Sequence, residues 1–220
     1  MARRTTTRDR LVRTAAGLFW SQGYAQTGVS SIMERASATS GSFYHFFPTK
    51  EDLLLAVLDA VGEMVAEEVL DSAERTADTA AGRLRVLADA YRDHVEAGAS
   101  AFGLPLVSLA GELGADHREA RLRLGQLLDE LVSRVERWCG KPEADLPSIA
   151  DQRRFADHVV AALEGAAAMA RARGDAGIVS AVAVELVGAL DPAAGARVDR
   201  GDEQLATRPQ GAAALDWRAW

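Results

Sequence analysis

Apolar residues recur at intervals of three and four through most of the chain. In the N-terminal part this pattern predicts a helix over residues 7–22, which Gly23 ends, and two short helices over residues 29–37 and 40–47. Pro48 stops the third helix because proline lacks the N–H that a continuing helix needs. A very short turn joins the second and third helices, so the first three form one compact unit.

The helical spacing continues beyond this unit. Thr49 and Asp52 have the spacing of a capping box, which predicts that a long fourth helix begins here and reaches about Ser72. Five further helices are expected over residues 79–97, 105–113, 116–139, 148–173 and 177–190. The alternation typical of strands never extends over more than a few residues. The pattern therefore predicts an all-α fold of about nine helices.

Composition narrows the setting in which such a protein works. Cys139 is the single cysteine, so no disulfide can form within the chain and a cytoplasmic location is expected. No apolar run reaches the roughly 18 residues of a membrane-spanning helix, and the richest one, residues 159–170, is interrupted by Glu164. Residues 1–10 are basic and polar, so we expect no secretory signal there and no membrane partner.

Charge is distributed unevenly along the chain. The net charge of −7 argues against a polyanionic partner, but residues 1–50 hold seven basic and two acidic side chains. That segment therefore carries +5, and the remaining 170 residues carry −12. Such asymmetry favours a DNA-binding segment joined to a part with another task. A chance excess of basic residues at a solvated terminus is the alternative interpretation.

Two short helices with a tight turn, supported by a first helix, favour a helix-turn-helix, whose second helix enters the major groove of DNA. Small polar residues that reach base edges suit that helix. Such residues gather at its start: Thr39, Ser40, Gly41, Ser42, Tyr44 and His45. Gly41 costs about 1 kcal/mol relative to alanine in a helix, which favours close approach to DNA, although it could also relieve the turn. Phe43, Phe46 and Phe47 are expected in the core.

At this point the sequence resembles a known family. The run from Gly23 to Leu54 is similar to the DNA-binding signature of TetR-type repressors. The positions that carry the resemblance are Gly23-Tyr24, Thr27, Ala38-Thr39-Ser40-Gly41-Ser42, Phe43-Tyr44-His45 and Lys50-Glu51. The chain departs from the signature at Ser37, where glycine is commoner in the turn, and at Met33, where alanine is commoner. Both departures suggest local adjustment of the turn.

The resemblance implies an N-terminal helix-turn-helix domain over residues 1–50 and a C-terminal helical domain for ligand binding and dimerisation over residues 51–190. Residues 191–220 are rich in alanine, glycine, aspartate and arginine, which predicts a loose tail. The resemblance also implies roles for single residues. Phosphate contacts are expected from Thr27, Tyr44 and Lys50, and added phosphate or minor-groove contacts from Arg3 and Arg4. Contacts near the base edges are expected from Thr39, Ser40, Ser42 and His45, with Gly41 letting the backbone approach.

The helix expected over residues 148–173 is rich in small side chains, which let helices approach closely. These are Ala161, Ala162, Gly165, Ala166, Ala167 and Ala168. In the family the last two helices of each subunit form the dimer interface, and residues 148–190 fit that role. Two-fold symmetry then predicts a palindromic operator. The alternative is that these helices belong to the core of one subunit.

The resemblance places a small-molecule effector of unknown identity among the middle helices, where Tyr91, His94, Phe102 and Trp138 are the candidate ligand-binding residues. Core packing is the alternative for each of them. The sequence lacks the common catalytic and phosphate-binding motifs, so neither an enzyme nor a cofactor is expected. We therefore expect a ligand-responsive repressor that binds double-stranded operator DNA as a homodimer. A metal-responsive regulator, using His94, His117 or Glu112, and a helical enzyme with a vestigial DNA-binding domain are the alternatives.

Overall fold

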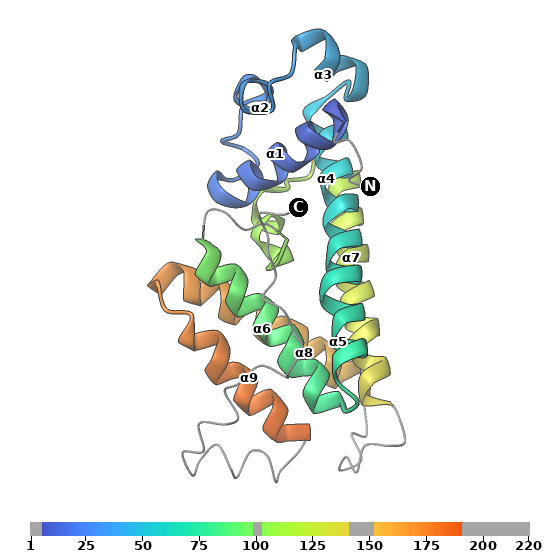
Figure 1. The fold of residues 1–220 in the computed structure, drawn as a ribbon, viewed down its shortest axis with the longest axis vertical. Helices are drawn as coiled ribbons and strands as arrows, with labels where there is room; N and C mark the ends of the chain where they lie inside the picture. Colours follow the sequence, from blue (N-terminus) through green and yellow to red (C-terminus); the bar gives the residue numbers. More distant parts are fainter. Residues whose placement is uncertain (1–5, 99–102, 141–151, 191–220) are drawn as a thin grey trace.

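The computed structural model describes residues 6–98, 103–140 and 152–190. All regular secondary structure in these ranges is helical, which confirms the expected all-α class (Figure 1). The main helices are α1 (Thr7–Gln22), α2 (Val29–Arg35), α3 (Ser40–Phe46), α4 (Lys50–Met64), α6 (Ala80–Ala97), α7 (Arg118–Cys139), α8 (Gln152–Arg173) and α9 (Gly177–Leu190). Within the described ranges, none of them has the length and apolarity that a bilayer span requires.

The hydrogen-bond pattern of the long fourth helix changes partway along its length, which the sequence did not predict. Helix α4 passes into a π-helical turn, η1 (Val65–Leu70), and then into α5 (Asp71–Thr76). The helical course therefore runs four residues beyond the expected end at Ser72. The capping box at its start forms as predicted, because the Thr49 hydroxyl accepts from the Asp52 N–H and the Asp52 carboxylate accepts from the Thr49 N–H.

The α-helix expected over residues 105–113 is wrong. Two short 3₁₀ turns occupy the segment instead, η3 (Leu106–Ser108) and η4 (Ala110–Glu112). The backbone N–H groups of Leu106 and Val107 donate to the buried carboxylate of Glu164 on α8. A distant side chain, which local propensity does not register, thus sets the course of this segment.

The N-terminal unit is assembled from α1, α2 and α3, and its core contains two of the three expected phenylalanines. Phe43 and Phe47 are buried, whereas the side chain of Phe46 is 37% exposed, so its expected place in the core is wrong. Phe46 is the last residue of α3 and Phe47, its C-cap, has an extended backbone, so the helical period does not relate these two side chains. Ser37, in the turn between α2 and α3, has a φ of +49°, a conformation that favours glycine.

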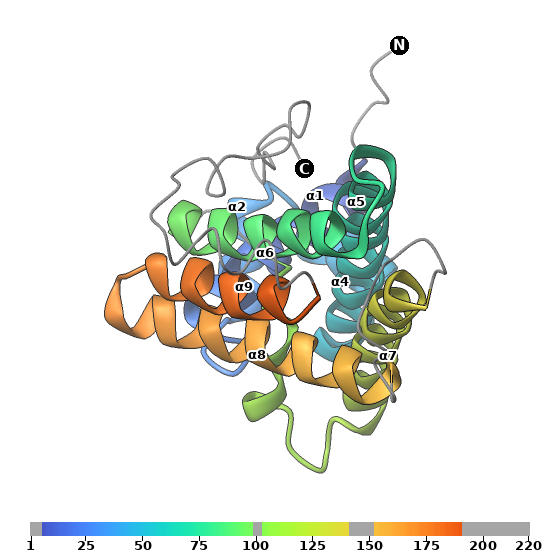
Figure 2. The ribbon, with the colours of Figure 1, turned by 90° about the horizontal axis from the view of Figure 1, so that it is seen from below.

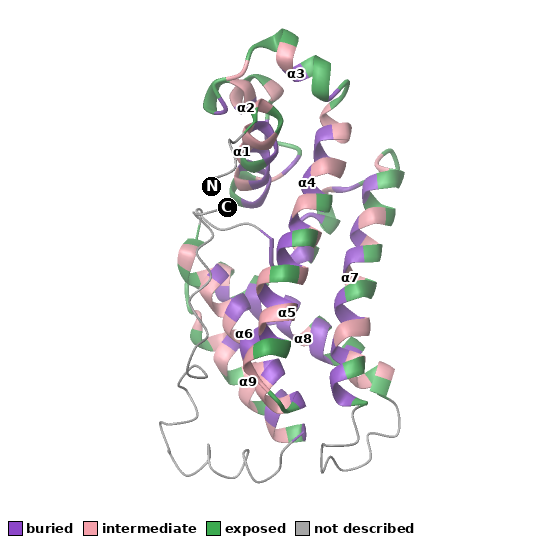
Figure 3. Cartoon of the chain, turned by 45° about the vertical axis from the view of Figure 1, so that its right-hand side comes forward, coloured by how far each residue is buried: buried purple, intermediate pink, exposed green. Residues whose placement is uncertain are grey.

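Helix α4 joins the N-terminal unit to the rest of the molecule. It packs against α1 at one end and against α7 along its length, while α6, α8 and α9 pack together beside it (Figures 1 and 2). In Figure 3 buried residues, coloured purple, recur along each of the long helices. Buried residues from both parts belong to one continuous hydrophobic cluster, so the N-terminal unit is held against the remainder by core packing as well as by α4.

Candidate nucleic-acid interface and ligand cavity

The first turn of α3 is fixed by a reciprocal cap. The Thr39 hydroxyl accepts from the Ser42 N–H at 3.2 Å, and the Ser42 hydroxyl accepts from the Thr39 N–H at 3.1 Å. Their two hydroxyls are also hydrogen-bonded to each other. Capping satisfies N–H groups that have no partner within the helix, so this end of α3 is held in one conformation.

The next residues of α3 form an exposed polar surface. Ser40, Gly41 and His45 are exposed, and the Tyr44 side chain is 55% exposed. A Cβ atom added to Gly41 would meet no heavy atom within 4 Å, and φ at Gly41 lies outside the region that requires glycine. Neither packing nor backbone conformation in this chain therefore demands glycine at this position. Helices α2 and α3 lie at one end of the molecule (Figure 1).

Two of the residues expected to contact phosphates are engaged within the protein. Thr27 is buried, and its hydroxyl donates to the Gly23 carbonyl at 2.6 Å. The Lys50 ammonium donates to the Tyr24 carbonyl and lies 4.1 Å from the centre of the Tyr24 ring. Burial lowers the pKa of Lys50, and the nearby charge of Glu112 opposes that shift. In this conformation both side chains stabilise the turn between α1 and α2.

Phe46 lies beside the exposed polar residues of α3 and was missed as a surface residue. Its side chain is exposed and its ring lies edge-on to that of His45, with 5.0 Å between the ring centres. The helical period alone would not have shown this, because Phe43 and Phe46 are three positions apart, a spacing that places two side chains on the same face of a helix. The exposed face of α3 therefore combines hydroxyl, imidazole and aromatic groups.

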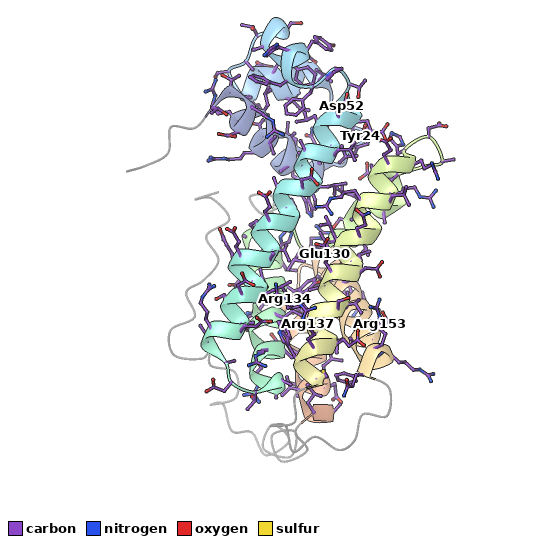
Figure 4. The ribbon with its side chains drawn as sticks, turned by 90° about the vertical axis from the view of Figure 1, so that its right-hand side faces the viewer. Tyr24, Asp52, Glu130, Arg134, Arg137 and Arg153 are labelled. Carbon is purple, nitrogen blue, oxygen red and sulfur yellow. The ribbon has the colours of Figure 1, made fainter. Side chains whose placement is uncertain are left out.

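A hollow of about 650 Å³ lies between the α4–η1 region and α7. This volume is within the range of small-molecule sites. Its lining comprises Gly62, Val65, Ala66, Leu70, Leu106, Gln126, Leu127, Asp129, Glu130, Leu131, Ser133, Arg134 and Arg137. Figure 4 shows the last two arginines and Glu130 in succession along α7. The π-helical turn η1 supplies three of the lining residues, and such turns are frequent at functional sites.

The ligand-binding residues expected from the sequence do not line this hollow. Trp138 is buried, and its indole N–H donates to the Glu74 carboxylate at 2.8 Å. Arg134 pairs with the same carboxylate at 3.1 Å. Burial favours the protonated form of Glu74, but these partners outweigh it and lower its pKa. Trp138 and Arg134 thus share the Glu74 carboxylate as their partner. Phe102, another of the candidates, lies outside the described residues.

Tyr91 and His94, the other two candidates, are buried together near α8. The Tyr91 hydroxyl donates to the Glu164 carboxylate at 2.6 Å, and burial together with the Glu164 charge raises the pKa of Tyr91. Burial, with a smaller contribution from the positive charge of Arg171, lowers the pKa of His94 to about 3. These two side chains therefore belong to a buried polar cluster with Glu164 and Arg171, apart from the hollow.

Helix α8 has one buried face and one exposed face. Val159, Leu163 and Ala167 are buried within the chain, where α8 packs against α6, α7 and α9. Between residues 161 and 172 the exposed positions form a second stripe of small and apolar residues: Ala161, Gly165, Ala168, Met169 and Ala172. Each face matches one of the two interpretations of this helix, intrachain core or contact with a second copy.

Of the three residues considered for a metal site, two contact the turn between α1 and α2 and the third lies elsewhere. The Glu112 carboxylate accepts from the Ala25 N–H at 2.9 Å, and the His117 ring lies edge-on to Tyr24. His94 lies in the buried cluster beside Arg171. Among the residues described, no group of three histidine, cysteine, aspartate or glutamate side chains is placed to hold an ion.

The N-terminal residues 11–57 match the family model described as bacterial regulatory proteins of the tetR family. The uncharacterized HTH-type transcriptional regulator YxaF of Bacillus subtilis is 35% identical over 79 residues, which cover 36% of this chain and 41% of that protein. A regulator of Lactococcus lactis is aligned over 66% of its length. An uncharacterized HTH-type transcriptional regulator of Mycobacterium tuberculosis is 29% identical over 181 residues, or 76% of this chain and 86% of that protein.

Solved structures extend the likeness to the whole described fold. A TetR transcriptional regulator from Chloroflexus aurantiacus superposes with a TM-score of 0.73 at 27% identity, covering 82% of this chain and 92% of that one. A regulatory protein TetR from Rhodobacter sphaeroides superposes with a TM-score of 0.75 at 23% identity, covering 83% and 98%, which shows the shared fold alone.

Proposed function

The chain belongs to the TetR family of DNA-binding transcriptional regulators, and from this we propose that it is a ligand-responsive repressor that binds a palindromic operator as a homodimer. The observation that carries the proposal is the exposed polar start of α3, which a reciprocal cap holds in one conformation. A capped, exposed recognition helix loses little conformational entropy when it enters a major groove. Such a protein would work in the cytoplasm, where the chromosome is.

In the proposed complex, Ser40 and His45 lie nearest the base edges, and Tyr44 and Phe46 lie toward the sugar–phosphate walls or thymine methyl groups. Gly41 lets the backbone approach. Lys50 and Thr27 act indirectly, by holding the turn between α1 and α2, unless Lys50 exchanges its carbonyl partner for a phosphate on binding. Few basic side chains then face the DNA, so the salt dependence of binding is moderate.

Titration of the purified protein with the DNA upstream of its own coding region tests this proposal. We expect specific binding that Tyr44→Ala weakens about tenfold or more, on the scale of losing one strong contact. The Tyr44 side chain is more than half exposed, so its truncation leaves the core intact and thermal unfolding should be unchanged. Measurements at two salt concentrations separate specific from electrostatic binding. Absence of any sequence preference would contradict the proposal for this DNA.

Gly41→Ala gives a sharper result because stability and binding should move in opposite directions. The added methyl group meets nothing in the free protein and raises helix propensity by up to about 1 kcal/mol, so the unfolding temperature should rise slightly. Operator affinity should fall by about tenfold, since the methyl group occupies the space where the backbone meets DNA. Unchanged affinity in a stabilised variant would show that Gly41 does not approach the operator.

The hollow between α4–η1 and α7 is the proposed effector site. Its lining joins apolar side chains with the charged groups of Glu130, Arg134 and Arg137, which suits an amphipathic small molecule. Because α4 lines the hollow and also packs against α1, a bound effector would shift α4 and change the spacing of the two recognition helices, which must be about 34–36 Å. A verified effector that left operator affinity unchanged would contradict this mechanism.

A further inference from the structure

The segment between α6 and α7 touches both the DNA-binding unit and the core of α8. Residues 103–117, here called the strap, contain the two 3₁₀ turns η3 and η4 and no longer helix. Its buried residues include Leu104, Leu106 and Leu109, which pack into the common hydrophobic cluster. The strap is therefore a packed part of the protein, and its polar groups have defined partners at both ends.

At its first end, a single peptide group of the strap joins α1 to α8. The Pro105 carbonyl accepts from the indole N–H of Trp20 on α1 at 3.4 Å. The N–H of the same peptide group, on Leu106, donates to the Glu164 carboxylate on α8 at 3.0 Å. Hydrogen bonds on the two sides of one peptide group polarise each other. The Pro105–Leu106 peptide thus links side chains of the DNA-binding unit and of α8 directly.

Two further side-chain contacts join α8 to the first end of the strap. The second carboxylate oxygen of Glu164 accepts from the Val107 N–H at 2.9 Å. The guanidinium of Arg171, about two turns later on α8, donates to the Ser108 hydroxyl at 2.7 Å, and that hydroxyl donates to the Pro105 carbonyl. Glu164 is 2% exposed, and a buried carboxylate is tolerated only where donors and positive charge surround it.

At its other end the strap holds the turn that connects α1 to α2. The Glu112 carboxylate accepts from the Ala25 N–H, and its oxygens lie 2.8 Å from the position of a Cβ at Gly23, whose φ is +91°. His117 meets the ring of Tyr24 edge-on, with 5.3 Å between the centres. This turn leads directly into the helix-turn-helix, so its position affects the placement of α3.

We propose that the strap couples α8 to the DNA-binding unit, with Glu164 as the latch on α8 and with Trp20 and Glu112 as its attachments to the unit. The coupling runs beside α4 and is separate from it. A change in α8 or in the strap that releases Glu164 loosens the turn between α1 and α2 and lowers operator affinity, although Glu164 touches neither DNA nor the hollow. This regulatory role rests on the proposed operator binding.

Glu164→Gln is the informative variant because it preserves shape and changes one group. A carboxylate accepts at both oxygens, whereas an amide accepts at one atom and donates at the other. If the amide oxygen meets Tyr91 and Leu106, the amide NH₂ faces the Val107 N–H, donor against donor. The latch therefore opens on one side with almost no change in volume. Glu63→Gln, at an exposed position of α4, is the matched control.

Hydrogen exchange of the full-length protein without DNA tests the strap itself. We expect faster exchange in residues 23–27 in Glu112→Ala, which loses the acceptor of the Ala25 N–H, and also in Glu164→Gln, whose substitution lies on another helix. Glu63→Gln and Glu119→Ala, both at exposed positions, should match the wild type. Exchange in residues 23–27 that stays at the wild-type rate in Glu164→Gln, with faster exchange confined to the strap, would overturn the proposal.

Operator titration tests the regulatory consequence. We expect Glu164→Gln and Trp20→Phe each to weaken operator binding by about 2- to 30-fold, the range of substitutions that alter coupling between sites. Because both act on one peptide group, the double variant should lose less than the product of the two effects. Effects that multiply, or a Glu164→Gln protein with wild-type affinity, would overturn it. Failure to find any operator counts against the proposed function, while the exchange result still decides the strap.

Discussion

Gly165→Arg should convert the proposed dimer into a folded monomer. A Cβ at Gly165 meets no heavy atom within 4 Å of this chain, and the residue lies on the exposed stripe of α8. Arginine is a better helix former than glycine, so one subunit should fold at least as well as the wild type. A second copy packed on the stripe would instead meet a long charged side chain. Size-exclusion chromatography with light scattering should show the change from dimer to monomer.

Operator binding should fall with the dimer. Two recognition helices on one particle bind two half-sites with an avidity that exceeds single binding by about 10²–10⁴, so we expect a loss of at least about 100-fold. Gly125→Arg is the matched control, because Gly125 lies on α7 with equally open space around its Cβ position. A Gly165→Arg protein that remains dimeric would place the interface on another surface.

Acid should destabilise the protein through His94. Its side chain is 1% exposed, and burial, aided by the positive charge of Arg171, lowers its pKa from 6.5 to about 3. Above pH 6.5 the imidazole is neutral in the folded and unfolded states. Below that pH His94 is protonated in the unfolded chain but stays neutral in the folded protein, so the free energy of unfolding decreases as pH falls toward 3. The loss is about 1.4 kcal/mol per pH unit, or about 2–3 kcal/mol at pH 4.5.

Urea unfolding of the wild type and of His94→Gln, measured between pH 7.5 and 4.5, checks this expectation. The glutamine variant should show a flatter dependence of unfolding free energy on pH. Glu164 faces the same cluster, and burial raises its pKa despite donors from Tyr91, Val107 and Leu106 and the charge of Arg171. Its titration changes stability in the opposite direction, but both proteins retain it, so the difference between the two curves reports His94. Parallel curves would contradict the prediction.

The helix boundaries of the N-terminal unit could be predicted from the sequence. Its helices begin and end within two residues of the expected positions, because caps, glycine and proline act on their immediate neighbours. Phe46 is the exception, because its spacing of three from the buried Phe43 is typical of a shared face, yet its side chain is exposed. Their roles on DNA rest on the resemblance and on the experiments above.

The structure gives two of the candidate ligand residues partners that the sequence did not indicate. Tyr91 and Trp138 were chosen as polar-tipped aromatic residues, but each hydroxyl or indole N–H has a carboxylate partner 73 or 64 positions away. Such pairings depend on how helices pack, which the order of residues along one helix does not reveal. The hollow lies elsewhere, where a π-helical turn in α4 faces α7.

Glu164 shows where sequence and tertiary structure divide. The sequence by itself determined the all-α class, the places of most helices, the helix-turn-helix and an acidic residue out of place in an apolar stretch, because these depend on periodicity and on neighbours a few positions apart. Only the tertiary structure decided that this carboxylate accepts from the N–H groups of Leu106 and Val107, which lie 58 and 57 positions earlier. It also decided that Trp20 donates to the Pro105 carbonyl, which belongs to the same peptide group as the Leu106 N–H. A buried charge must find donors, and packing alone selects which segment supplies them.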